Sequence, residues 1–136
     1  MIAIDVVAYE KMVASCLREY PLEACGILLG SPLRVSWVKP ATNIERSARI
    51  YTVDPKDMLV ADRLAEQLGV EMVGVYHSHT HSEAFPSPTD VAQAPDPTWY
   101  YFLISLKREI PEVRAYQIVE GKITETPLVV ESSKIQ

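Results

Sequence analysis

The sequence predicts an α/β (α+β) domain, a mixed sheet with helices packed on it. Two observations lead to this fold class. Short apolar segments typical of strands outnumber segments with helical periodicity, and several of these strands follow one another directly along the chain. The chain has 136 residues, 48% of them hydrophobic and 23% charged, which suits one core built without disulfide bonds. We therefore expect a single domain over residues 1–136.

The first part of the chain predicts a helix followed by a hairpin. Residues 8–19 carry apolar side chains at helical spacing, and Pro21 ends the helix. The apolar run at 24–29 is typical of a buried strand, and the glycine and proline at 30–32 indicate a turn. Residues 33–37 alternate between apolar and polar side chains, which predicts a second strand paired with the first.

A polar loop at 40–47 and a short strand at 49–53 are expected before the second helix. Asp54 as N-cap and Pro55 at the first helical position indicate where this helix begins. Gly69 is typical of the position that follows the last turn of a helix.

The rest of the chain predicts mainly strands. Ser87 and Asp90 form an S-x-x-D helix start, but Pro95 stops that helix within two turns. Strands are expected at 70–79, 100–106, 113–119 and 123–130.

Composition and charge exclude several classes of protein. The net charge of −5 disfavours nucleic acid as a partner. The N-terminus lacks the features of a signal peptide, and no apolar run approaches the length that spans a bilayer, so no membrane association is expected. Cys16 and Cys25 do not have metal-site spacing and are interpreted as free core thiols. A reducing, cytoplasmic location follows.

The segment from His77 to Asp90 carries the candidate chemistry. On a strand, residues two apart point to the same face, so His77 and His79 can direct two imidazoles at one point. Asp90, at the start of the following helix, can supply a carboxylate. Two histidines and one carboxylate hold a tetrahedral zinc ion and leave one position open, as in catalytic sites. Whether His81 has any role stays open.

Each of these residues also has an interpretation without a metal. The two histidines can be surface or satisfied polar groups at a strand end. Ser87 and Asp90 can be a plain capping pair. Glu23, further upstream, can be an acid at a helix end in solvent.

The residues together resemble a known family. The segment from His77 to Asp90 resembles the pattern of the JAMM (MPN-plus) metalloproteases. It consists of His77-Ser-His79, seven residues, Ser87, two residues and Asp90. Glu23 lies in a segment similar to the E-x-C-G strand of that family. The likeness covers nearly the whole chain. It is greatest to the short bacterial Mec-type peptidases, which work with small sulfur-carrier proteins.

The resemblance implies a fold, a cofactor and roles. The fold would be the MPN/JAB fold, a curved mixed sheet with flanking helices, cytidine deaminase-like. One zinc ion per chain would be held by His77, His79 and Asp90. Glu23 would act as the proton carrier and Ser87 as a donor to the oxyanion.

The implied substrate is a ubiquitin-like sulfur-carrier protein that ends in Gly-Gly. The enzyme would cleave the amide bond after Gly-Gly and release cysteine or a short tail. Thr80 stands where deubiquitinases of the family usually have proline, and the chain is short, so polyubiquitin is not the expected substrate. The pathway, whether cysteine biosynthesis, siderophore or cofactor sulfur transfer, and a possible homodimer stay open.

Two other functions are kept as alternatives. One is a metal-free MPN-type scaffold or binding module. The other is a histidine-triad nucleotide hydrolase, suggested by His77, His79 and His81 at alternate positions. Cytidine deaminase chemistry is excluded because H-x-E with P-C-x-x-C is absent.

Overall fold

The computed structural model describes residues 1–132, whose strands form one eight-stranded sheet in the order β7-β6-β5-β4-β2-β3-β1-β8. The strands are β1 (Ile2–Asp5), β2 (Cys25–Ser31), β3 (Arg34–Ala41), β4 (Glu71–His79), β5 (Tyr100–Ser105), β6 (Glu112–Val119), β7 (Lys122–Thr126) and β8 (Leu128–Glu131). The helices are α1 (Val6–Glu19), α2 (Pro55–Leu68) and α3 (Pro88–Ala92). Parallel and antiparallel pairs both occur, which confirms the predicted mixed sheet.

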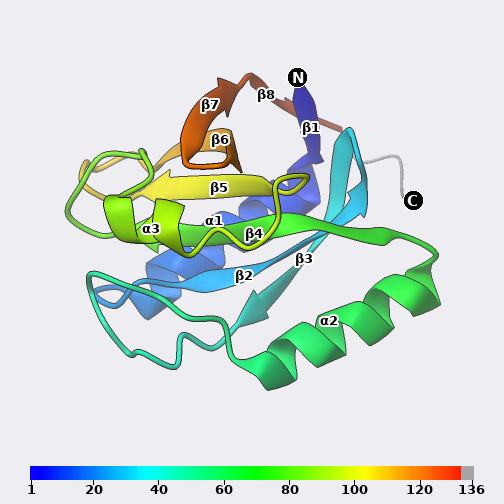
Figure 1. Ribbon diagram of the computed structural model, residues 1–136, viewed down its shortest axis with the longest axis horizontal. Helices are drawn as coiled ribbons and strands as arrows, with labels where there is room; N and C mark the ends of the chain where they lie inside the picture. The colour runs from blue at the N-terminus through cyan, green and yellow to red at the C-terminus, as the bar shows by residue number, and fades with distance from the viewer. Residues whose placement is uncertain (133–136) are drawn as a thin grey trace.

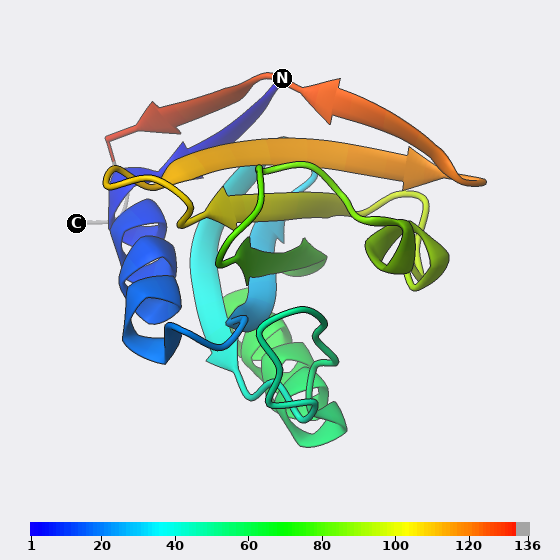
Figure 2. The ribbon, with the colours of Figure 1, turned by 90° about the vertical axis from the view of Figure 1, so that its left-hand side faces the viewer.

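The sheet is strongly curved. Its two edge strands, β7 and β8, are consecutive in the chain and are joined by Pro127 alone. The sheet must therefore curl until its two edges meet at that residue, as the end-on view in Figure 2 shows. Figure 1 shows α2 at the lower side of the molecule and α1 behind the strands.

The two long helices pack on opposite faces of the sheet. Successive residues of a strand point to opposite sides, and β2 serves both. Leu28 belongs to the cluster that contains α1 residues such as Met12, whereas Ile27 packs in the cluster that contains Ala61 of α2. The centre of the sheet is thus covered on both faces, and β4, next to β2, is buried from Val73 to its end at His79.

Two predictions about strands were wrong, and one strand was not predicted. Residues 49–53 form only an isolated bridge between Val53 and Asn43, because the Asn43 side chain bonds the loop backbone in place of a ladder. The strand expected at 123–130 is divided at Pro127, which has no N–H to donate to a ladder. The strand β1 was not predicted, because four residues carry little pattern. Within residues 1–132 no helix is long and apolar enough to cross a membrane.

Candidate metal centre

The C-terminal end of β4 presents two histidines on one face. β4 lies between β2, antiparallel to it, and β5, parallel to it, so the backbone around His77 and His79 is fixed from both sides. Both side chains are buried, with exposed fractions of 2% and 5%. Ser78 points the other way, where its hydroxyl accepts from the N–H of Ala24 at 2.8 Å. Ser78 thereby ties the strand to the residue that follows Glu23.

Asp90 lies against the same two histidines. Its Oδ2 atom is 3.2 Å from Nε2 of His77 and 3.0 Å from Nε2 of His79, and the two Nε2 atoms are 3.2 Å apart. These three donor atoms form a nearly equilateral triangle. In tetrahedral zinc sites with bonds of about 2.0–2.1 Å, neighbouring donor atoms are separated by about 3.3 Å. The triangle therefore has the size of one face of such a site.

The chemistry of this donor set also fits a cation. The ring nitrogen Nδ1 of His79 lies 2.8 Å from the carbonyl of Glu83, which can only accept, so this nitrogen carries a proton. In the neutral ring Nε2 then offers a lone pair towards Oδ2 of Asp90. Lone pairs directed at one point repel one another unless a cation or protons lie between them. A carbonyl behind a histidine is also the arrangement that orients metal-binding imidazoles.

Burial and hydrogen bonding set the charges of the three groups. Burial lowers the pKa of His77, which favours the neutral imidazole that metals bind. Burial by itself would raise the pKa of Asp90, but hydrogen bonds from His77, His79 and the Ser87 backbone outweigh it and hold this pKa below its ordinary value. The site thus contains an ionised carboxylate beside at least one neutral imidazole.

Glu23 lies beside this cluster and is not the solvated acid of the alternative interpretation. Its exposed fraction is 4%, and its Oε1 atom has no hydrogen-bond partner among residues 1–132. Burial raises the pKa of Glu23 to about 7, opposed by the nearby His79. Its backbone is fixed by the loop before α2, because its N–H donates to Ser47 and its carbonyl accepts from Asn43. A buried carboxyl with a free oxygen and a near-neutral pKa is suited to proton transfer.

Ser87 and Asp90 do form the capping pair, and this arrangement positions both side chains. The Ser87 hydroxyl accepts from the N–H of Asp90 at 3.1 Å, and Oδ2 of Asp90 accepts from the N–H of Ser87 at 2.8 Å. The cap uses the serine oxygen as an acceptor, so the hydroxyl proton remains available for another group. Ser87, Glu23 and His79 line one pocket of about 450 Å³.

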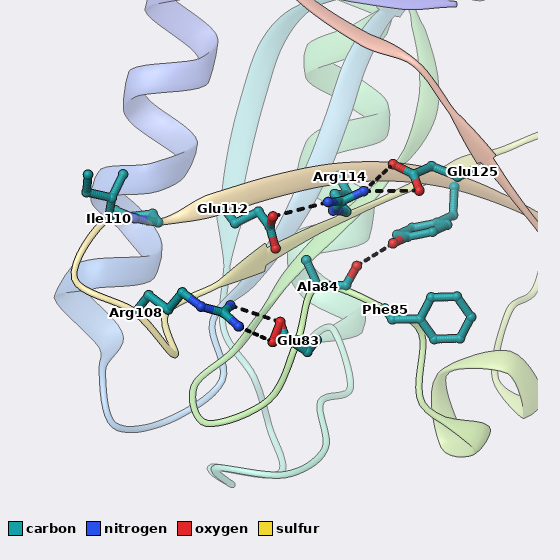
Figure 3. Close-up of a pocket in the computed structure, with 10 residues that line it drawn as sticks. Glu83, Ala84, Phe85, Arg108, Ile110, Glu112, Arg114 and Glu125 are labelled. Carbon is teal, nitrogen blue, oxygen red and sulfur yellow. Dashed lines mark hydrogen bonds and ion pairs between the residues drawn. The ribbon is translucent and has the colours of Figure 1, made fainter.

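The loop between β4 and α3, residues 80–87, is held by hydrogen bonds and an ion pair from residues outside the donor cluster. Figure 3 shows this part of the molecule, where a second pocket of about 610 Å³ is bordered by two sets of ion pairs. Arg108 binds both carboxylate oxygens of Glu83, and the hydroxyl of Tyr116 donates to the carbonyl of Ala84. Ser105 adds a hydrogen bond to the Ser82 carbonyl at 2.7 Å. The carbonyl that orients His79 is therefore held by β5, β6 and the turn between them.

His81 does not join the cluster. It lies beyond the end of β4 and is exposed, and its Nδ1 is 2.8 Å from the Thr80 hydroxyl. The three alternating histidines of a histidine triad therefore do not converge here. No role was predicted for Tyr51, whose ring stacks on that of His77 with centroids 4.2 Å apart. None was predicted for Glu83 either, because its contribution is a backbone carbonyl that no side-chain pattern reveals.

Comparisons with known proteins agree with this geometry. A model of the prokaryotic homologs of the JAB domain matches residues 5–119. The chain belongs to this prokaryotic JAB family. This JAB protein is 42% identical over 120 residues to the CysO-cysteine peptidase of Mycobacterium tuberculosis, covering 86% of the chain and 82% of the relative. It is 34% identical over 122 residues to a probable TtuB-protein conjugate cleaving protease of Thermus thermophilus, covering 89% and 77%.

Solved structures confirm the MPN/JAB fold. Protein DSY2949 from Desulfitobacterium hafniense superimposes with a TM-score of 0.90 at 30% identity, over 97% of this JAB protein and 94% of that chain. AF2198, a JAB1/MPN domain protein from Archaeoglobus fulgidus, gives a TM-score of 0.62 at 17% identity, over 97% and 98%. At that low identity the second match shows the fold alone.

Proposed function

We propose that this JAB protein is a zinc-dependent peptidase that hydrolyses the amide bond after the C-terminal Gly-Gly of a ubiquitin-like sulfur-carrier protein, releasing cysteine or a short tail. One observation carries the proposal: three donor atoms at 3.0–3.2 Å from one another share a site with a buried carboxyl that has an unpartnered oxygen. Relatives named as a CysO-cysteine peptidase and a TtuB-protein conjugate cleaving protease support the substrate class.

His77, His79 and Asp90 would hold the zinc ion. The chemistry that zinc supplies when bound is that of a Lewis acid, which stabilises negative charge developing on oxygen. The three side chains are suited to this because the two histidines are buried, the Asp90 side chain is only 8% exposed, and each is fixed by strand pairing, by the helix cap or by the Glu83 carbonyl. They leave one face of the site open to the pocket that Glu23 lines.

Glu23 takes a proton from the attacking water and passes it to the departing amine. Its free oxygen can accept that proton, and its pKa near 7 allows it to give the proton back during the same turnover. Ser87 donates a hydrogen bond from its hydroxyl to the oxygen of the scissile carbonyl as negative charge builds there. Both residues line the same pocket, so a single bound peptide bond can meet them together.

The decisive experiment is Glu23→Gln with a CysO–cysteine conjugate as the substrate. Gln keeps the shape of the side chain but cannot accept the proton, so we expect kcat to fall by about 10²–10⁴-fold while one zinc ion per chain is still bound. Cleavage is followed by intact mass and zinc by elemental analysis. Glu19→Gln, an exposed acid at the end of α1, is the matched control and should cleave normally.

Two outcomes would contradict the proposal. Normal cleavage by Glu23→Gln would remove this residue from the chemistry. A wild-type protein that retains no zinc and cleaves nothing would favour the alternative of a metal-free binding module. Loss of cleavage on treatment with a chelator, restored by added zinc, is expected if the metal is required.

A further inference from the structure

The pocket beside Glu23 has one wall that the proposed chemistry does not use. Glu23, His79 and Ser87 form one side, and the other residues that line it are Ala48, Arg49, His81 and Ser82. These come from the loops at 42–54 and 80–87. A volume of about 450 Å³ is ample for one amino-acid residue.

Arg49 gives this wall a positive charge with free donors. Within residues 1–132 its guanidinium takes part in no ion pair, whereas those of Arg34, Arg108 and Arg114 do. Its backbone is nevertheless fixed, because the hydroxyl of Ser47 accepts from the N–H groups of Arg49 and Ile50 at 3.0 and 3.3 Å. Arg49 is exposed and lines the pocket, so its guanidinium can offer unused donors to a group bound there.

His81 lies in the same wall and is held on two sides. Its ring packs against Tyr20 with centroids 5.9 Å apart, and its Nδ1 is engaged with the Thr80 hydroxyl. The other ring nitrogen, Nε2, is left for a further partner. The wall therefore presents the planar fork of Arg49 and one imidazole nitrogen, both groups that bind carboxylates.

A second pocket near the histidines has a different character. It measures about 320 Å³ and is lined by uncharged residues that include Tyr51, Met58, Val75 and Trp99. Tyr51, which lines this pocket, stacks on His77 of the donor cluster. Of these two pockets, only the one beside Glu23 is lined by an arginine, so an anionic group is better accommodated there.

We propose that Arg49, with His81 beside it, binds the free α-carboxylate of the residue that is released. The inference rests on the proposed function, because it is Glu23 that must return a proton to the departing nitrogen, which puts the departing residue in the pocket that Glu23 lines. Hydrolysis breaks the C–N bond, adds the hydroxyl of water to the glycine carbonyl carbon and leaves a proton on the departing nitrogen. No oxidant or reductant is needed.

This assignment defines the substrate class. In a C-terminal amino acid the α-carboxylate is two bonds from the departing nitrogen, so it lies close to the scissile bond and within this pocket. In a conjugate through a lysine side chain, no carboxylate lies near that nitrogen. Arg49 therefore selects carriers extended by a single C-terminal residue over carriers joined to lysine.

The test compares two conjugates that differ only at that carboxylate. A CysO thioester is ligated to cysteine or to cysteinamide, and each product is incubated with the zinc-loaded protein. We expect kcat/KM for the cysteine conjugate to exceed that for the cysteinamide conjugate by about 10- to 100-fold, the usual worth of a hydrogen-bonded charge. Arg49→Ala should lower this ratio to a few-fold at most, the part left to His81, and Arg49→Lys should keep more of it.

Arg46→Gln is the matched control, since Arg46 is an exposed arginine of the same loop that does not line the pocket. It should leave the ratio unchanged. A wild-type ratio near 1, or a ratio that survives Arg49→Ala, overturns the inference while leaving the proposed peptidase intact. If the wild-type protein cleaves neither conjugate, it is the proposed function that fails.

Discussion

The side chain of Asn43 makes four hydrogen bonds to the backbone on both sides of the loop before α2. Its Nδ2 donates to the carbonyls of Glu23 and Ile50, each at 3.0 Å. Its Oδ1 accepts from the N–H groups of Glu45 and Thr52, at 3.1 and 3.0 Å. One buried amide thus fastens the loop to the residue proposed to carry the proton.

Asn43→Ala should therefore affect both stability and cleavage. Four partners lose their hydrogen bond, and water can replace only some of them, so we expect the free energy of unfolding to fall by about 2–4 kcal/mol. The rate should fall as well, because the Glu23 carbonyl loses its anchor. Urea denaturation and initial rates measure the two effects.

The control is Glu45→Ala, at an exposed residue of the same loop, which should change the free energy of unfolding by less than about 0.5 kcal/mol. An equally small effect of Asn43→Ala would contradict the role of Asn43.

At the scale of elements, the loop between β4 and α3 joins the two parts of the donor cluster. It begins after His79, ends at Ser87, and supplies the Glu83 carbonyl that orients His79. Its shape depends on β6, through the hydrogen bond from Tyr116 to Ala84. A strand that contributes no residue to the donor cluster thus helps to position it.

Tyr116→Phe tests this dependence. The buried carbonyl of Ala84 loses its donor, which should cost about 1–3 kcal/mol of stability, and zinc affinity should fall about tenfold, as for other groups that orient metal ligands. Competition with a chromogenic chelator measures the affinity. Tyr101→Phe is the matched control, because its hydroxyl bonds the backbone of Asp96, donating to the carbonyl at 2.8 Å and accepting from the N–H at 3.1 Å, and does not bond the loop between β4 and α3. It should cost similar stability with no change in zinc affinity, and equal affinities for both variants would argue against the role of β6.

Local signals explain which elements the sequence predicts. The start of α2 followed the prediction, because the Asp54 side chain accepts from the N–H of Lys56 and Gly69 adopts the left-handed conformation that ends the helix. The spacing of His77 and His79 likewise requires only the alternation of a strand. The strand β1 and the division at Pro127 depend on pairing between distant segments, as between β1 and β8, and such pairing leaves no local pattern.

At the scale of the whole molecule, the donor atoms come from the centre of the sheet and from a short helix outside it. α3 has five residues, none of them fully buried. It is held by its cap, by the contact of Asp90 with the two histidines, and by Val91, which packs against the cluster that contains Val75. The central strand β4 is covered on both sides. A cation bound by all three residues therefore links the least buried helix to the core.

Metal binding should for this reason stabilise the whole fold and not only the site. A ligand that binds only the folded state at a hundred times its dissociation constant adds about 2.7 kcal/mol, which for a domain of this size raises the melting temperature by roughly 10 °C. We expect zinc to produce such a rise in melting temperature and a chelator to reverse it. Asp90→Asn should reduce the rise strongly when each variant is compared with its own metal-free form. Asp62→Asn, an exposed acid on α2, should show the full rise. A zinc-dependent rise that is equally large in Asp90→Asn would mean that the cation binds elsewhere, because removing one of three ligands must weaken a site built from them.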